Sequence, residues 1–208
     1  MLDSSSVVSN CILIYEKNGI KTPNNSKELK TILTLDFKIK IVKYAYDILI
    51  NNIKLIEKSP EIRIKNGYIT YLIPLIYLFE SYIIQVRILM DFWAKYFIFL
   101  PGYQNLGESF NKHKKNIKNI NDKEYQNFVL SMDWFDNMKK IRDGIKSGTT
   151  IFPFFNEKEG KFLMLSMNNK INTNIEKNMK KFCEDNYNKI FDYINFIFIH
   201  FLKKSNTE

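Results

Sequence analysis

The stretch Phe79-Glu-Ser-Tyr-Ile-Ile-Gln-Val-Arg-Ile-Leu-Met-Asp-Phe-Trp93 lies within the most apolar part of the chain, residues 68–100. Large apolar side chains recur there at intervals of three or four residues, the spacing of one helix face. They are Phe79, Tyr82, Val86, Leu89, Trp93 and Tyr96. The part is long enough to span a bilayer, but charged residues interrupt it, namely Glu80, Arg87, Asp91 and Lys95. We therefore expect a buried central helix, with Pro74 in its first turn, where a missing amide costs little.

A second amphipathic helix is predicted on the N-terminal side, over residues 33–58. Its core-facing stripe is expected to comprise Phe37, Ile41, Tyr44, Ala45, Ile48 and Leu55. Ser59-Pro60 should end this helix, because the residue before a proline disfavours helical backbone. The short apolar run Cys11-Ile-Leu-Ile-Tyr15 predicts a small strand. Residues 1–30 are thus expected to form an N-terminal extension packed on a single domain of residues 31–208.

The C-terminal half predicts further helices and one hairpin. Pro101-Gly102 should end the central helix, and a short basic helix is expected over residues 108–118. Asp122 is a predicted N-cap of a helix that continues to Gly148. Its apolar side is Phe128, Met132, Phe135, Met138, Ile141 and Ile145. Residues 149–155 and 161–166 predict a β-hairpin with Pro153 on an edge strand, followed by a last helix over residues 175–203. The expected fold is mainly α, a helical bundle with a small β-hairpin before the last long helix.

Composition narrows the functional classes. The 31 Lys and Arg residues outnumber the 22 Asp and Glu residues, giving a formal charge of +9 that attracts RNA, DNA or anionic membranes. An AT-rich genome would raise Lys, Asn and Ile usage together, so the excess can also reflect composition. Two cysteines are too few for a disulfide scaffold or a cysteine zinc site, and no signal peptide is indicated, so a cytoplasmic protein is expected. Without a Gly-rich phosphate loop or a cluster of metal ligands, we expect no cofactor and no metal.

One segment can carry chemistry, Ile141-Arg-Asp-Gly-Ile-Lys-Ser147, at the predicted end of a helix. Together with residues 79–93 it resembles the HEPN superfamily, helical-bundle proteins marked by an arginine, a polar residue and then a histidine at the end of a core helix. Arg142 and Asp143 match the first two positions. Ser147 occupies the histidine position, which departs from the pattern. The resemblance covers about residues 68–202.

The resemblance implies a homodimer in which two such helices form a composite cleft for RNA, and active members are metal-independent endoribonucleases. Arg142 would stabilise the charge that develops on a phosphate, whereas a histidine would move the proton of the attacking 2′-OH. Serine is far too weak a base for that role. Ser147 therefore indicates a natural member that binds without cutting, a deliberate inactivating substitution, or a false match. For Arg142 itself, a solvated cation that favours the helix dipole remains an alternative.

Other residues are assigned by their positions on the predicted helices. Glu80, Arg87 and Asp91 share one face of the central helix and would support the Arg142 cleft, with an ion pair between Arg87 and Asp91. His113 is expected on a solvated basic surface and His200 in the core or an interface. Phosphate contacts are expected from lysines of the helix that carries Arg142 and of the predicted basic helix over residues 108–118: Lys139, Lys140, Lys146, Lys112, Lys114 and Lys115.

The sequence thus predicts an RNA-binding, HEPN-like protein with impaired cleavage, in a toxin–antitoxin, antiviral-defence or RNA-processing setting. Its expected partners are RNA, a second copy of the chain and, in such a setting, an antitoxin or defence component. Two rivals stay open. One is a non-catalytic helical module that binds a protein through its aromatic helices. The other is a membrane-surface protein held by its basic face, although we expect no membrane partner.

Overall fold

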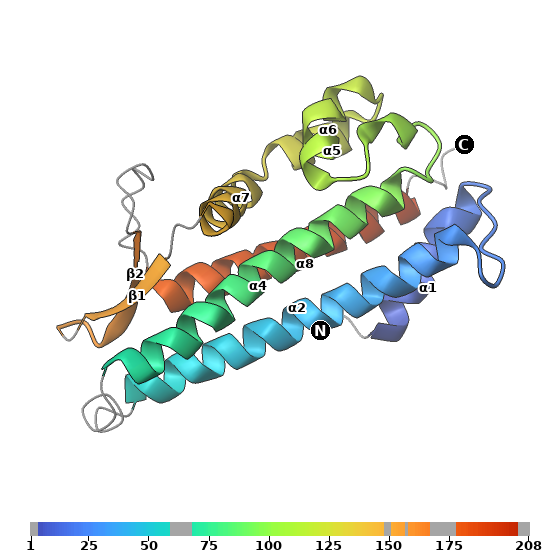
Figure 1. The fold of residues 1–208 in the computed structure, drawn as a ribbon. Helices are drawn as coiled ribbons and strands as arrows, with labels where there is room; N and C mark the ends of the chain where they lie inside the picture. The colour runs from blue at the N-terminus through green and yellow to red at the C-terminus, as the bar shows by residue number, and fades with distance from the viewer. Residues whose placement is uncertain (1–3, 59–67, 148–150, 157, 167–177, 204–208) are drawn as a thin grey trace. The chain divides into compact units, whose positions relative to one another are not determined.

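The computed structural model describes residues 4–58, 68–147, 151–156, 158–166 and 178–203, and within them it is mainly helical (Figure 1). A two-stranded antiparallel hairpin precedes the last helix, which confirms the coarse prediction of the fold. The α-helices are α1 (Ser4–Lys17), α2 (Lys27–Lys58), α4 (Tyr68–Phe97), α5 (Phe110–Asn116), α6 (Lys123–Leu130), α7 (Asp133–Lys146) and α8 (Met179–Lys203). Two 3-10 helices, η1 (Gln104–Leu106) and η2 (Ile117–Asn119), and the strands β1 (Ile151–Asn156) and β2 (Lys161–Ser166) complete the described elements.

The chain divides into two compact units. Unit 1 comprises Met1–Ile41, Arg87–Asp133 and Ile190–Glu208, and unit 2 comprises Val42–Val86 and Trp134–Lys189. The divisions fall inside α2, α4 and α8, so each of these helices contributes residues to both units.

In unit 1, the core is built on the second half of α4. Leu89, Trp93 and Tyr96 are fully buried, as their spacing predicts. The Trp93 ring meets Tyr96 and Tyr193 edge-on, at centroid distances of 5.6 and 5.9 Å. Edge-on contacts add specific geometry to the general gain from burying aromatic surface. The contact between Trp93 and Tyr193 joins α4 to α8 within this unit.

Residues 11–15 form part of helix α1, so the predicted strand is wrong. Cys11, Ile14 and Tyr15 are buried while Leu13 is exposed, which is the three-and-four spacing of a helix face. A run of consecutive apolar residues does not distinguish this pattern from a buried strand. The helix is held by Tyr96: its ring stacks on Tyr15 at 4.5 Å, its carbonyl accepts from the Tyr15 hydroxyl at 2.6 Å, and its hydroxyl donates to the Cys11 carbonyl at 3.0 Å.

Replacing Tyr15 by Phe should lower the free energy of unfolding by about 1 kcal/mol, because the Tyr96 carbonyl loses its short hydrogen bond and keeps only the Phe99 amide at 3.4 Å. Urea denaturation of Tyr15→Phe measures this change. Tyr44→Phe is the matched control, since the Tyr44 side chain is 69% exposed and should lose nothing measurable. Equal stability of the two variants would contradict the role given to the Tyr15 hydroxyl.

The face of α2 predicted to be buried is the wrong one. Phe37, Tyr44 and Leu55 are 58%, 69% and 56% exposed. The buried apolar residues of α2 are Ile32, Leu35, Val42, Leu49, Ile50, Ile53 and Ile56. Apolar residues recur with helical spacing on two sides of this helix, and periodicity alone does not say which side meets the core.

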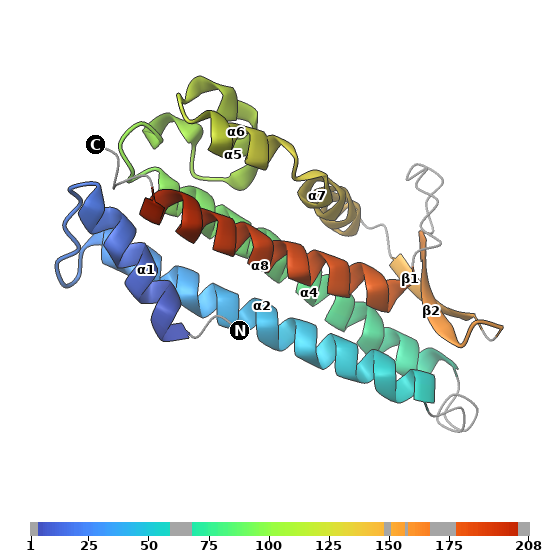
Figure 2. The same ribbon diagram turned by 180° about the vertical axis from the view of Figure 1, so that it is seen from behind.

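The parts of α2, α4 and α8 that belong to unit 2 lie side by side (Figure 2), and aromatic side chains join them. Tyr46 stacks on Tyr187 at 3.9 Å, and the buried Tyr82 hydroxyl donates to the Cys183 carbonyl at 3.3 Å. Helix α4 begins at Tyr68, so Pro74 is its seventh residue. The prediction that Pro74 lies in the first turn is therefore wrong. The face predicted for this half of α4, including Phe79, is buried.

The hairpin of unit 2 is confirmed, with its second strand as predicted and its first over residues 151–156; residues 149 and 150 of the predicted strand lie outside the described residues. Phe155 pairs with Phe162 across the ladder, with their rings 5.1 Å apart, and Pro153 pairs with Met164. Proline fits because each strand of a two-stranded sheet is an edge. An isolated bridge between Leu163 and Asn178 ties the hairpin to the residue that precedes α8.

The single helix predicted between Asp122 and Gly148 is two helices. Helix α6 ends at Leu130 and α7 begins at Asp133. Ser131 lies between them, and its hydroxyl donates back to the Phe128 carbonyl at 2.7 Å. Serine and aspartate side chains compete for backbone groups and so favour helix ends. The apolar spacing continues across the break, which is why periodicity did not reveal it.

Candidate functional site

The C-terminal end of helix α7, in unit 2, carries the Arg142 segment except for Ser147, which follows the helix. Its buried residues are Trp134, Phe135, Met138, Ile141 and Gly144, and its other side carries charged residues, among them Lys139, Lys140, Asp143 and Lys146. Burial of the apolar side fixes the rotation of the helix about its axis. That rotation leaves the Arg142 side chain 18% exposed and the Asp143 side chain 50% exposed.

Arg142 is only partly satisfied by its surroundings. Its Nη1 lies 3.2 Å from Asp143 Oδ1, an ion pair between neighbours in sequence. Its Nε is buried and has no hydrogen-bond partner among the described residues. Guanidinium groups bind carboxylates and phosphates through two parallel N–H bonds. Arg142 thus keeps bonding capacity that Asp143 does not use.

Ser147 follows the end of α7. Its Oγ donates to the Gly144 carbonyl at 2.8 Å, and its amide donates to the carbonyls of Asp143 and Gly144. The hydroxyl therefore closes the last helical turn. Among the described residues this hydroxyl bonds only to that carbonyl and to no base that could activate it as a nucleophile.

The residues of α4 that were predicted to support Arg142 do not all belong to one unit: Glu80 is in unit 2, whereas Arg87 and Asp91 are in unit 1. Arg87 Nη1 lies 2.6 Å from Asp91 Oδ1, which confirms the predicted ion pair in unit 1. The same Asp91 oxygen accepts from the amide of Phe110 at 2.8 Å, so this carboxylate also holds the start of α5. Glu80 belongs to unit 2, like Arg142, and burial raises the pKa of its carboxyl. Support of Arg142 by these three residues stays a prediction.

The predicted phosphate-binding lysines lie on two helices. Lys139, Lys140 and Lys146 are on α7, with Lys140 and Lys146 exposed. On α5, Lys112 and Lys115 are exposed. Lys114 is half-buried, and its Nζ donates to the Met132 carbonyl at 3.0 Å. It thus supplies a hydrogen-bond donor to the backbone between α6 and α7.

His113 is not on a solvated surface, and that prediction is wrong. The side chain is fully buried, and burial lowers the pKa of its imidazole to about 3. Its Nε2 lies 2.9 Å from the Tyr125 hydroxyl, and its ring stacks on Phe110. The spacing of Phe110, His113 and Ile117 on one side of α5 could have revealed this, but the surrounding lysines obscured it.

Because of His113, the free energy of unfolding should decrease as the pH is lowered below about 6.5. Below about pH 6.5 the unfolded chain protonates this histidine, whereas the folded protein keeps it neutral down to about pH 3. Between these values wild type should lose up to about 1.4 kcal/mol of unfolding free energy per pH unit more than His113→Gln does. Urea denaturation at pH 8, 6.5, 5.5 and 4.5 tests this difference. The two proteins should show the same slope between pH 8 and 6.5, and parallel curves below pH 6.5 would contradict a buried neutral His113.

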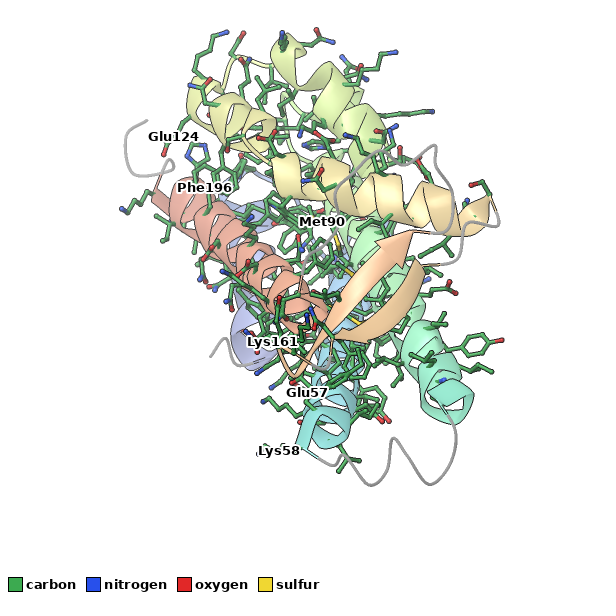
Figure 3. All side chains as sticks on the ribbon, turned by 90° about the vertical axis from the view of Figure 1, so that its left-hand side faces the viewer. Glu57, Lys58, Met90, Glu124, Lys161 and Phe196 are labelled. Atoms are coloured by element: carbon green, nitrogen blue, oxygen red, sulfur yellow. The ribbon has the colours of Figure 1, made fainter. Side chains whose placement is uncertain are left out.

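Asp122 caps α6 and connects it to α8 in unit 1. Its Oδ1 accepts from the amide of Tyr125, while its Oδ2 accepts from the Tyr103 hydroxyl and lies 2.7 Å from His200 Nε2. Glu124, labelled in Figure 3 near Phe196, lies 3.1 Å from the other His200 ring nitrogen. His200 is accordingly buried, as one of its two predicted locations required. The described residues contain no group of three or more potential metal ligands.

A pocket of about 620 Å³ lies beside the C-terminal half of α4 in unit 1. It is lined by Asp91, Lys95, Ile98, Gln104, Gly107, Glu108, Ser109 and Lys112. Sequence reasoning assigned Asp91 and Lys112 to a site around Arg142 and did not single out the other pocket residues. Nothing in the local pattern marks them, because the pocket exists only once residues 98–109 fold back beside α4.

Comparisons with protein-family models, with curated proteins and with solved structures gave no match to this chain. By length and hydropathy alone, Leu72–Phe97 would suit a membrane span, and it is the one such helix within the described ranges. The core helix of a soluble protein has the same properties.

Proposed function

We propose that the chain is an RNA-binding protein related to the HEPN ribonucleases, acting in the cytoplasm in a toxin, defence or RNA-processing setting. The observation that carries the proposal is Arg142, which stands just before the last turn of an amphipathic helix and has an Nε without an acceptor among the described residues. Lys139, Lys140 and Lys146 on the same helix supply further positive charge.

The guanidinium of Arg142 has a physical reason to bind phosphate. A buried donor that lacks an acceptor costs free energy, and Asp143 engages only Nη1. If the side chain turns outward, a phosphate can accept from Nε and a second nitrogen together, which removes this cost. Nearby lysines would add attraction that does not depend on RNA sequence.

Ser147 supports binding with little or no cleavage. Attack by a ribose 2′-OH needs a group that accepts its proton near neutral pH, and imidazole is suited to that task. The Ser147 hydroxyl is instead bonded to the Gly144 carbonyl at the end of the helix. The loss of a general base typically lowers a rate by about two to four orders of magnitude.

The proposal includes a homodimer, because the resemblance implies that two copies of the motif helix form the RNA cleft. A composite cleft doubles the charge presented to one RNA, since each copy contributes its own Arg142.

RNA binding should weaken about tenfold in Arg142→Ala, through the loss of a charge-assisted contact to phosphate. Fluorescence anisotropy with a labelled single-stranded RNA, repeated at several salt concentrations, measures the affinity and its salt slope. Lys189→Ala is the control, because this exposed lysine of α8 removes the same charge from a different helix of unit 2. Equal losses in the two variants would show a general charge effect and overturn the role of Arg142.

Ser147→His should create or restore cleavage that leaves 2′,3′-cyclic phosphate ends in the presence of a metal chelator. Product ends are identified by mass spectrometry of a defined RNA oligomer. The double variant with Arg142→Ala should be inactive again, because the developing phosphate charge would lose its stabilisation. A well-folded Ser147→His protein that leaves RNA intact would count against the ribonuclease relationship.

The alternative is a helical module that binds a protein, such as an antitoxin or defence component. It is favoured by the exposed apolar residues of α2, where Phe37 and Tyr44 are mostly solvent-accessible. Unchanged RNA binding by Arg142→Ala, together with an inert Ser147→His, would favour this alternative over the RNA-binding proposal.

A further inference from the structure

Hydrogen bonds and close packing hold the wall of the pocket beside α4 in unit 1 in place. Asp91 Oδ1 is bonded to both Arg87 and the amide of Phe110, which fixes the end of the 98–109 segment against α4. Gly107 has φ +91°, and a Cβ placed on it would lie 3.0 Å from Lys112 Cβ. The stem of Lys112 therefore packs closely against Gly107 and leaves no room for a side chain there.

The charges that line the pocket are unequally compensated. Arg87 compensates Asp91. Lys95 and Lys112 have no ion pair among the described residues, although the Lys95 ammonium lies 4.9 Å from the centre of the Phe92 ring. Glu108 likewise has no ion pair within the described ranges. Two cations thus face one carboxylate, and the pocket favours a ligand of net negative charge.

The other lining groups suit a ligand that is more than a simple ion. The Ser109 hydroxyl accepts from the Lys112 amide at 3.4 Å, so its own proton can be donated to a ligand. Gln104 offers an amide, and Ile98 offers apolar surface. A volume of about 620 Å³ lies within the range of small-molecule sites, which are roughly 300–1,000 Å³.

We propose that this pocket binds a phosphoryl group carried on a small organic body, such as a nucleoside monophosphate. Lys95 and Lys112 hold the phosphoryl oxygens, Ser109 donates to one of them, and Ile98 and Gln104 contact the organic part. The 5′-phosphate end of an RNA presents the same chemistry. This site does not depend on the role proposed for Arg142, which belongs to the other unit.

The test titrates the full-length protein with inorganic phosphate, with AMP, and with two RNA oligomers that differ only in a 5′-phosphate. Isothermal calorimetry gives the affinities, and ¹⁵N NMR shifts of the Gly107 and Lys112 amides report on the pocket. Lys95→Gln and Lys112→Gln should each weaken AMP binding about tenfold. Glu108→Gln should strengthen it about threefold, because a like charge is removed. Lys118→Gln is the control, an exposed lysine of η2 in the same unit that does not line the pocket.

The outcomes separate the possibilities. Binding of AMP with these opposite effects of the Lys and Glu variants supports the proposal. A preference for the 5′-phosphorylated RNA over its unphosphorylated partner identifies an RNA end as a source, and its absence points to a free nucleotide. No pocket shifts up to millimolar AMP, or equal losses in Lys95→Gln and Lys118→Gln, overturn the proposal. Arg142→Ala should bind AMP as wild type does. The pocket is therefore tested independently of the RNA-binding role proposed for Arg142.

Discussion

Burial of one side of α4 is the constraint on which both units depend. In unit 1 it places Leu89, Trp93 and Tyr96 in the core, and in unit 2 it places Phe79 and Tyr82 there. Full burial of each such side chain is worth about 1.5–3 kcal/mol, so this side of the helix outweighs any single polar interaction in the protein. Tyrosine adds selectivity, because each buried hydroxyl must find an acceptor. Tyr96 finds the Cys11 carbonyl and Tyr82 finds the Cys183 carbonyl, which specifies the neighbouring helix as well as covering it.

Polar groups in unit 1 determine how the short elements are arranged. Asp91 bonds Arg87 one turn away on α4 and the start of α5, 19 residues further along the chain. Asp122 caps α6 and bonds His200 on α8. Lys95 and Lys112, which form no ion pair within the described part of the chain, line a pocket with Asp91, and Arg142 stands near the end of a different helix. Structural roles and the proposed ligand-binding roles thus fall to polar residues that look alike in the sequence.

The parts of the fold that follow from local spacing could be predicted from the sequence. The buried side of α4, the Asp122 cap, the hairpin and the position of Arg142 at a helix end are of this kind. Features that depend on which of two similar faces meets the core could not. Apolar residues on both sides of α2 misled the burial prediction, and a lysine-rich neighbourhood hid the burial of His113. The contact between Asp122 and His200 joins positions 78 residues apart, beyond any local pattern. The candidate pocket was missed for the same reason, because its lining residues meet only in the folded chain. Arg142 and Ser147 could be singled out because they lie in one short sequence segment.

The two cysteines have a practical consequence for studying the Arg142 segment. Cys11 and Cys183 are both buried free thiols, and burial raises the pKa of each well above its usual range. Thiolates, not thiols, react with alkylating reagents. An exposed cysteine introduced at Ser147, one atom different from serine, would therefore take up a fluorophore or spin label selectively, while both native cysteines stay in place.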